Sequence, residues 1–124
     1  MGATTSLTTY NERFAEVARR LPDRIAVRLK SPTGYLQISY SELHHQVQGV
    51  ARALVAQGLE RQARAAILSE NRPEWVVSYL GIYMAGGSAV PLDPQISSSE
   101  WRLLLDDSDA QVIFVSGLLL PKLN

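Results

Sequence analysis

Length, composition and charge exclude several classes of protein before any motif is considered. The chain has 124 residues, of which 46% are hydrophobic and 19% are charged, which suits one globular domain rather than a disordered segment. Twelve basic and twelve acidic residues give a formal net charge of +0, so bulk charge offers no case for a nucleic-acid partner. The sequence contains no cysteine, which excludes disulfides and thiolate metal sites and fits a reducing compartment.

Targeting signals are also missing from the sequence. No apolar run is long enough to cross a bilayer, and the N-terminus lacks the basic and apolar regions of a signal peptide. Met1, Gly2 and Ser6 fit the myristoylation pattern, but in a small polar tail we interpret this match as coincidental. We therefore expect a cytoplasmic protein, for which a peripheral association with membranes stays open.

The first part of the chain is predicted to form a helix and a β-hairpin. Thr9 and Glu12 form a capping box at the start of the helix, which ends at Pro22. Turn residues separate two short strand-like runs at residues 25–29 and 35–39, so these runs are expected to pair. The apolar face of the helix contains Phe14, Val17, Ala18 and Leu21.

A second capping box, formed by Ser39 and Glu42, opens the next expected helix. Gly58 can take the left-handed conformation that ends a helix, and Leu59 is the apolar residue expected to pack behind it. One face of this helix, with apolar residues at steps of four, three and four, consists of Leu43, Val47, Val50 and Leu54.

Residues 63–116 alternate between strand and helix, which predicts a parallel sheet with right-handed crossovers. The three expected strands lie at residues 63–68, 88–92 and 112–115. The predicted fold class is therefore α/β: an N-terminal helix and β-hairpin followed by a β-α-β-α-β unit. We expect residues 1–124 to form a single domain.

The first helix of this unit, residues 75–85, is apolar almost all round, so it is expected to be buried on more than one side. Asn71 and Glu74 are expected to cap it reciprocally, with Pro73 in the first turn. Gly86 is expected to end it.

The second helix of the unit is predicted to begin at a capping box formed by Ser97 and Glu100. Its expected inner face consists of Trp101, Leu104 and Leu105. The leucines at 118–120 have no obvious partner in the sequence and are interpreted as the first turn of a further, interrupted helix.

Two segments of the chain resemble the first and second core motifs of one enzyme superfamily, and they occur in the same order as in that superfamily. Residues 38–59 (ISYSELHHQVQGVARALVAQGL) are similar to the first core motif of the adenylate-forming, or AMP-binding, enzymes. Residues 81–94 (GIYMAGGSAVPLDP) with residues 97–108 (SSSEWRLLLDDS) are similar to the second. The superfamily contains acyl-CoA synthetases, adenylation domains of peptide synthetases and luciferases. Residues 68–75 (LSENRPEW) favour the fatty acyl-CoA ligases, whereas residues 89–94 (AVPLDP) are shared with the peptide synthetases.

The resemblance implies a function for a longer protein rather than for this chain. Such enzymes activate a carboxylate with ATP and Mg²⁺, and acyl-CoA synthetases then transfer the acyl group to CoA. The phosphate loop, the adenine segment, the ribose-binding aspartate and the lid with the catalytic lysine do not occur in these 124 residues. We therefore expect the N-terminal fragment of a long-chain fatty acid–CoA ligase, inactive alone, with no catalytic, cofactor-binding or metal-binding residue of its own.

Three alternatives stay open. The chain could belong to a peptide-synthetase adenylation domain, or it could be a self-standing α/β module for binding or assembly. A flavodoxin-type nucleotide domain is disfavoured, because no loop leaving a strand is built to hold phosphate.

The expected partners follow from the same interpretation. They are the rest of the same polypeptide and, in the complete enzyme, a fatty acid. Surface left bare around residues 75–84 is expected to favour a homo-oligomer.

Several residues could carry chemistry, but a structural role is preferred for each. Gly86 and Gly87 leave a helix and enter a strand, whereas a phosphate cradle has the opposite order. The neighbours His44 and His45 point in different directions and are expected to be solvated.

Three acids, Asp106, Asp107 and Asp109, follow a helix and precede a strand, so they are expected to form a stop and a turn rather than a metal site. Acids at this end of a helix oppose its dipole, and Ser108 or nearby N–H groups are expected to offset that cost.

Two further groups lie where a ligand could bind, although core packing and helix capping are the preferred interpretations. The aromatic group, which could line an acyl tunnel, consists of Trp75, Tyr79, Ile82 and Tyr83. The polar group, at a helix N-terminus after a strand, consists of Asn71, Arg72 and Glu74.

Overall fold

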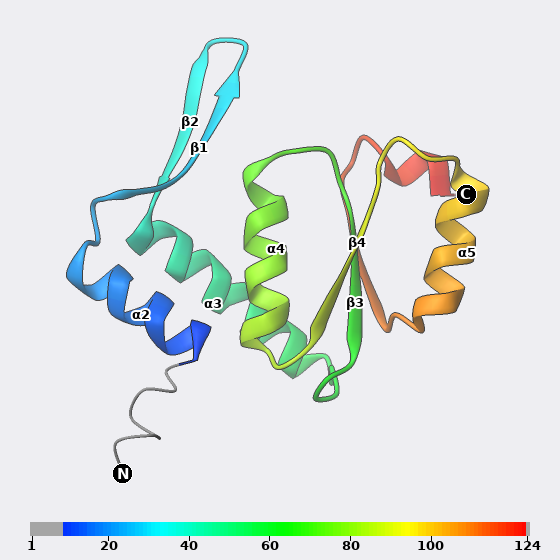
Figure 1. Ribbon diagram of the computed structural model, residues 1–124, viewed down its shortest axis with the longest axis horizontal. Helices are drawn as coiled ribbons and strands as arrows, with labels where there is room; N and C mark the ends of the chain where they lie inside the picture. Colours follow the sequence, from blue (N-terminus) through cyan, green and yellow to red (C-terminus); the bar gives the residue numbers. More distant parts are fainter. Residues whose placement is uncertain (1–8, 124) are drawn as a thin grey trace. The chain divides into compact units, whose positions relative to one another are not determined.

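The structure is a computed structural model that describes residues 9–123 (Figure 1). The myristoylation match at Met1, Gly2 and Ser6 lies outside the described residues. Contacts within the chain divide it into two compact units, and the boundary between them in the sequence lies between Gln46 and Val47. The single-domain interpretation of residues 1–124 stays a prediction.

The first unit contains the predicted helix and hairpin. Helix α2 (Tyr10–Arg20) begins where the Thr9 side chain accepts a hydrogen bond from the Glu12 N–H at 3.1 Å. Strands β1 (Ile25–Ser31) and β2 (Gly34–Ser39) pair antiparallel, which confirms the hairpin. On the predicted apolar face of α2, Ala18 is buried, whereas Leu21 is exposed.

Helix α3 (Tyr40–Ala56) begins at the predicted capping box. The Glu42 N–H donates to Ser39 Oγ, and the Ser39 N–H donates to Glu42 Oε1, each at 3.2 Å. At the other end, Gly58 has a φ of 89°, and the Leu59 N–H reaches back to the Leu54 carbonyl at 3.0 Å. This pattern is the glycine-ended helix that the sequence predicts.

The second unit is built on a parallel three-stranded sheet in the order β4-β3-β5. The strands are β3 (Arg64–Leu68), β4 (Ser88–Leu92) and β5 (Val112–Val115). Both pairings are parallel, which confirms the predicted β-α-β-α-β unit. Strand β3 is central, and its residues 65–68 are 0% exposed.

Helices α4 (Pro73–Met84) and α5 (Ser98–Ser108) lie on opposite sides of this sheet (Figure 1). Each face of the sheet has its own hydrophobic core. Alternate residues of β3 pack in one core or the other, because successive strand residues face opposite ways. Ala65 and Ile67 pack with Ile82 of α4 and with the end of α3. On the other face lies a cluster with α5, which consists of Ala66, Leu68, Leu92, Trp101 and Leu119.

One prediction about α4, that of its N-terminal cap, is wrong. Its N-cap is Arg72, which makes no side-chain capping bond, and Asn71 is exposed. The predicted capping box fails because the Glu74 carboxylate pairs with the Arg72 guanidinium instead. The fully buried residues of the helix, Val77, Ser78, Gly81 and Ile82, pack toward α3 and β3, and only Glu74 and Tyr83 of the helix are exposed, which agrees with the predicted burial on more than one side. Pro73 does occupy the first helical position, as predicted.

Some of the predictions about helix α5 and the tail are confirmed, and others are wrong. Ser97 caps α5 by accepting from the Glu100 N–H, and Trp101 is 2% exposed, but Leu104 faces solvent. Leu119 is 4% exposed and packs in the core with Trp101, just before the short 3₁₀ helix η1 (Leu120–Leu123). Leu119 therefore has a partner in the chain, contrary to the prediction, whereas Leu118 and Leu120 are exposed.

A close approach between α3 and α4 gives a test of this packing. A Cβ built on Gly81 would lie 2.5 Å from Val50 Cγ1, whereas a Cβ on Gly49 would meet nothing within 4 Å. Gly81→Ala should therefore destabilise the chain by about 1–3 kcal/mol through overpacking. Gly49→Ala, the matched helical control, should stabilise it by about 0.5–1 kcal/mol.

Urea unfolding of both variants, followed by circular dichroism, checks this pair. Adding Val50→Ala to Gly81→Ala should recover part of the loss, because it removes the clashing methyl groups. Equal effects of alanine at 81 and 49 would contradict the packing described.

Candidate functional site

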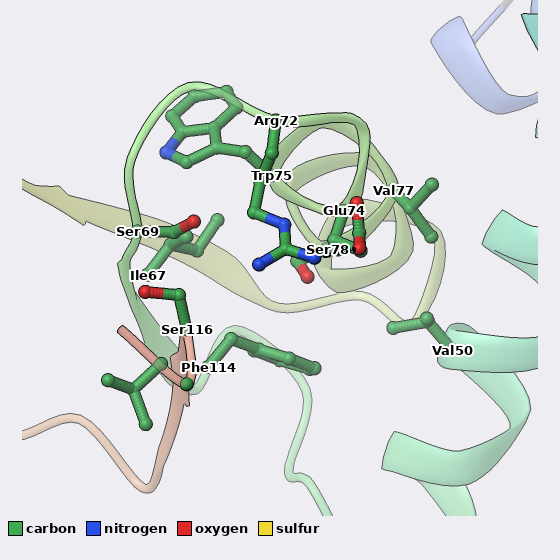
Figure 2. Close-up of a pocket in the computed structure, with 12 residues that line it drawn as sticks. Val50, Ile67, Ser69, Arg72, Glu74, Trp75, Val77, Ser78, Phe114 and Ser116 are labelled. Carbon is green, nitrogen blue, oxygen red and sulfur yellow. Dashed lines mark hydrogen bonds and ion pairs between the residues drawn. The ribbon is translucent and has the colours of Figure 1, made fainter. Parts of the chain in front are cut away.

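A cavity of about 410 Å³ opens at the carboxyl ends of β3 and β5, beside the N-terminus of α4 (Figure 2). Its apolar wall comes from helices α3 and α4 and from strands β3 and β5, and it includes the rings of Trp75 and Phe114. Its polar lining consists of Ser69, Arg72, Glu74, Ser78 and Ser116.

The topology of the sheet places the cavity there. The chain leaves β3 for β4 on one side and then returns across β3 to β5 on the other. The crossover helices α4 and α5 therefore lie on opposite faces, which leaves a crevice at the carboxyl edge between β3 and β5. Open α/β sheets generally bind ligands at such a switch point.

An ion network occupies the rim of the cavity. The Arg72 guanidinium lies between two carboxylates: Nη1 is 3.3 Å from Glu70 Oε1, and Nη2 pairs with Glu74 Oε2. The Ser116 hydroxyl donates to Glu70 Oε2 at 2.7 Å. Because Glu70 follows β3 and Ser116 follows β5, this bond joins the ends of the two strands.

These contacts favour the ionised forms of all three charged groups. The hydrogen bond from Ser116 is the main cause that lowers the pKa of Glu70, and Arg72 lowers it further. Arg72 also lowers the pKa of Glu74, and the two carboxylates, Glu74 first, raise the pKa of Arg72.

The charges of the cavity do not fit a polyphosphate. Among the described residues, Arg72 is the only cationic side chain that lines it, and this guanidinium is already paired with two carboxylates that would repel an anion. Between residues 9 and 123, no cluster of three or more His, Asp or Glu side chains could hold a metal ion. The cavity suits an uncharged or apolar group better than a nucleotide phosphate.

Of the polar group predicted for this edge, the structure brings Arg72 and Glu74 together at the cavity, and Asn71 does not line it. Sequence reasoning missed Glu70 and Ser116. The available signal was their position directly after two buried strands, because the carboxyl ends of parallel strands meet at one edge.

The predicted aromatic group divides between core and surface. Ile82 is 0% exposed in the core. Trp75 and Tyr79 stack with their centroids 5.2 Å apart, and Tyr83 follows at 5.1 Å from Tyr79. Of these four side chains, only Trp75 lines the cavity, so the structure shows an aromatic row along α4 rather than a tunnel.

The structural interpretation holds for the glycine pair. Gly86 has a φ of 90°, and its N–H bonds to the Tyr83 carbonyl at 3.0 Å, which ends α4 as predicted. A Cβ on Gly87 would lie 3.0 Å from the Ala63 carbonyl oxygen, so this glycine permits a close approach of two backbones.

The acidic group also has its predicted structural role. Asp109 ends α5 in the left-handed conformation, with a φ of 57°. As expected, Ser108 contributes at this helix end, because its hydroxyl donates to the Leu105 carbonyl at 3.0 Å. A contact that was not expected comes from Arg64, whose Nη1 donates to the Ser108 carbonyl at 2.9 Å.

The two histidines differ from one another. His45 is exposed, as expected, whereas His44 is half-buried, with its ring edge-to-face against Phe14 at 5.0 Å between centroids. The prediction that both are solvated is therefore wrong for His44.

Comparisons with known proteins identify the family. The model of the AMP-binding enzyme family matches residues 14–124, nearly the whole chain. This chain belongs to the AMP-binding, adenylate-forming enzymes, as the two core motifs predict.

Individual relatives come from two branches of that family. Tyrocidine synthase 3 of Brevibacillus parabrevis is 35% identical over 93% of this chain. A propanoyl:CoA ligase of Mycobacterium tuberculosis, whose acyl group carries a methyl-dioxo-octahydro-indenyl ring system, is 36% identical over 92%. The crystal structure of the nonribosomal peptide synthetase FmoA3 with AMPPNP has a TM-score of 0.83 at 27% identity, over 92% of this chain.

All of these relatives are much longer than the matched region. The chain covers 2% of the tyrocidine synthase, 22% of the CoA ligase and 12% of the FmoA3 chain. The fold agrees with the N-terminal domain of adenylate-forming enzymes. Among the described residues, no helix combines the length and apolar character needed to span a membrane.

The ion network predicts a pH dependence of stability. Because the folded pKa of Glu70 lies below the unfolded value of about 4.3, its contribution is present above that pH and is lost as pH falls through the folded pKa. The Glu70 side chain is 35% exposed, so the effect should stay under about 1 kcal/mol.

Urea unfolding between about pH 3 and pH 7 measures this contribution of Glu70 to the free energy of unfolding. Glu70→Gln should reduce the loss of stability at acid pH, because the amide still accepts from Ser116 but does not titrate. Glu60→Gln, at an exposed glutamate outside the cavity lining, is the matched control for the removal of one carboxylate. If Glu70→Gln and the unmodified chain lose the same stability between neutral and acid pH, Glu70 is not the source of this pH dependence.

Proposed function

We propose that this chain is the N-terminal part of an acyl-CoA ligase, of the type that adenylates a long-chain fatty acid and then forms its CoA thioester. The observation that carries the proposal is the ordered pair of core motifs at residues 38–59 and 81–108. The segment LSENRPEW and the 36% identity to a CoA ligase support this branch. In the complete enzyme, ATP, Mg²⁺ and CoA would be bound by residues beyond those of this chain.

In this proposal the chain is a scaffold that is inactive alone. Its central cavity presents paired charges and apolar walls, which suit packing or an apolar group better than a triphosphate. No lysine lies in the cavity, and Lys30 and Lys122 are both exposed. We also propose a cytoplasmic location for the protein.

A second candidate is an adenylation domain of a peptide synthetase. It is favoured by the 35% identity to tyrocidine synthase 3 and by the AVPLDP segment. The two candidates share the adenylation step and differ in the acid that is activated and in the thiol that accepts it.

The inactivity of the chain is tested by ATP–pyrophosphate exchange. The purified 124-residue chain should give only background exchange with a panel of fatty acids and with the amino acids. Boiled chain gives the background, and a complete acyl-CoA ligase is the positive control. Exchange above background that rises with the amount of the 124-residue chain would overturn the proposal.

The branch is tested with the protein encoded by the whole reading frame that contains this chain. The fatty acid–CoA ligase proposal predicts acyl-CoA, detected by chromatography, from long-chain fatty acids, ATP and CoA. Adenylation of amino acids, trapped as hydroxamates, without any acyl-CoA product would favour the peptide-synthetase candidate instead.

A further inference from the structure

The chain crosses from one face of the sheet to the other directly after β5. Ser116 continues the pairing with β3, because its N–H donates to the Leu68 carbonyl at 3.1 Å, and it lines the cavity on the α4 face. Three residues later, Leu119 is 4% exposed in the core on the α5 face, and η1 lies beside α5 (Figure 1). The turn at residues 116–120 therefore leads the chain away from the cavity.

Ser116 provides the acceptors and the anchor of this turn. Its carbonyl accepts from the N–H groups of Leu119 at 3.1 Å and Leu120 at 2.9 Å. Its hydroxyl donates to Glu70 Oε2 at 2.7 Å, and the residue is only 8% exposed. A bond from a hydroxyl to a carboxylate is charge-assisted and about twice as strong as a bond between neutral groups. Glu70 therefore fixes the residue on which the turn is built.

The Glu70 carboxylate is itself held in place by its neighbours. Its Oε1 lies 3.3 Å from Arg72 Nη1, and its backbone carbonyl accepts from the Ser69 hydroxyl at 2.8 Å. These contacts limit the conformations of Glu70, so less conformational entropy is lost when its Oε2 binds Ser116.

We propose that Glu70 is a positioning residue that holds the turn at residues 116–120 in place, and so keeps Leu119 in the core on the α5 face and residues 118–123 away from the cavity. Loss of the bond on the cavity side then loosens the packing of Leu119 on the opposite face. The contacts that form this device all join described residues, and none of them uses an unpaired strand edge. The role of Glu70 requires no enzymatic activity of the chain.

A second anchor of the same segment gives the competing explanation. Arg102 Nη2 donates to the Leu123 carbonyl at 2.8 Å, which ties the end of η1 to α5. If this exposed contact and the burial of Leu119 were sufficient, removal of the Glu70 carboxylate would leave the turn unchanged. The two explanations therefore differ in how the amides of the turn respond to a change at Glu70.

Residue-resolved amide hydrogen exchange by NMR makes this comparison. In Glu70→Ala, the amides of Leu119 and Leu120 should exchange at least about 5-fold faster than in the unmodified chain, because Ser116 is no longer held. Gly81→Ala, which lowers the stability of the fold without touching the turn, is the control and should accelerate these two amides much less. Unchanged exchange of both amides in Glu70→Ala, or equal acceleration in the two variants, would overturn the proposal.

Further variants separate the bond to Ser116 from the removal of a charge. Glu70→Gln keeps an oxygen that accepts from Ser116 and should restore part of the protection lost in Glu70→Ala. Glu74→Ala removes the other carboxylate beside Arg72 and should leave the amides of the turn within about 2-fold of their original rates. No restoration by glutamine, or an acceleration in Glu74→Ala as large as in Glu70→Ala, would contradict the role given to Glu70.

A double variant tests whether Glu70 and Ser116 act through one bond. Ser116→Ala should accelerate the amides of Leu119 and Leu120 as Glu70→Ala does. Combining the two substitutions should then add little, because each alone already removes the bond. Fully additive effects of the two substitutions would show that the turn is not held through this bond.

Discussion

The second unit depends on the complete burial of β3 between two layers of helix. Residues 65–68 have no exposed surface, and they contribute alternately to a core under α3 and α4 and to a core under α5. A strand buried on both faces must be apolar at every position, which explains the continuous Ala-Ala-Ile-Leu run. The small alanines face one core each, and the bulkier Ile67 and Leu68 lie next to the carboxyl edge.

The same arrangement creates the cavity. Because the two crossover helices pack on opposite faces, none of residues 47–123 fills the crevice beside Phe114 at the carboxyl edge. Glu70, Arg72 and Ser116 tie its rim together with hydrogen bonds and an ion pair. Such a rim has no surplus positive charge, which supports the proposal that this part of an AMP-binding enzyme is framework and that the groups contacting ATP belong to other segments.

Features set by local chemistry could be predicted from the sequence. The caps at Thr9, Ser39 and Ser97, the glycine stop at Gly58 and the three parallel strands each follow from residues close together in the chain. The caps and the glycine stop are local because a side chain and a backbone group only three or four residues apart, or the conformation of one glycine, decide them.

Features that depend on distant residues were missed or predicted wrongly. Asn71 does not cap α4, because Glu74 is drawn to Arg72. Leu119 is buried because it packs in one cluster with Trp101 and Leu92, which lie far from it in the sequence. The bond between Glu70 and Ser116 joins residues 46 positions apart, so it follows only from the pairing of the two strands that precede them and not from a local pattern.

Native-state hydrogen exchange tests the central claim, that the buried β3 strand holds the second unit together. If it does, the amides of residues 65–68 should exchange most slowly in the chain and only through global unfolding, so their opening free energy should equal that from urea unfolding. The amides of the β1–β2 hairpin should exchange faster. Exchange of β3 by local opening, at rates like those of the hairpin, would contradict this account.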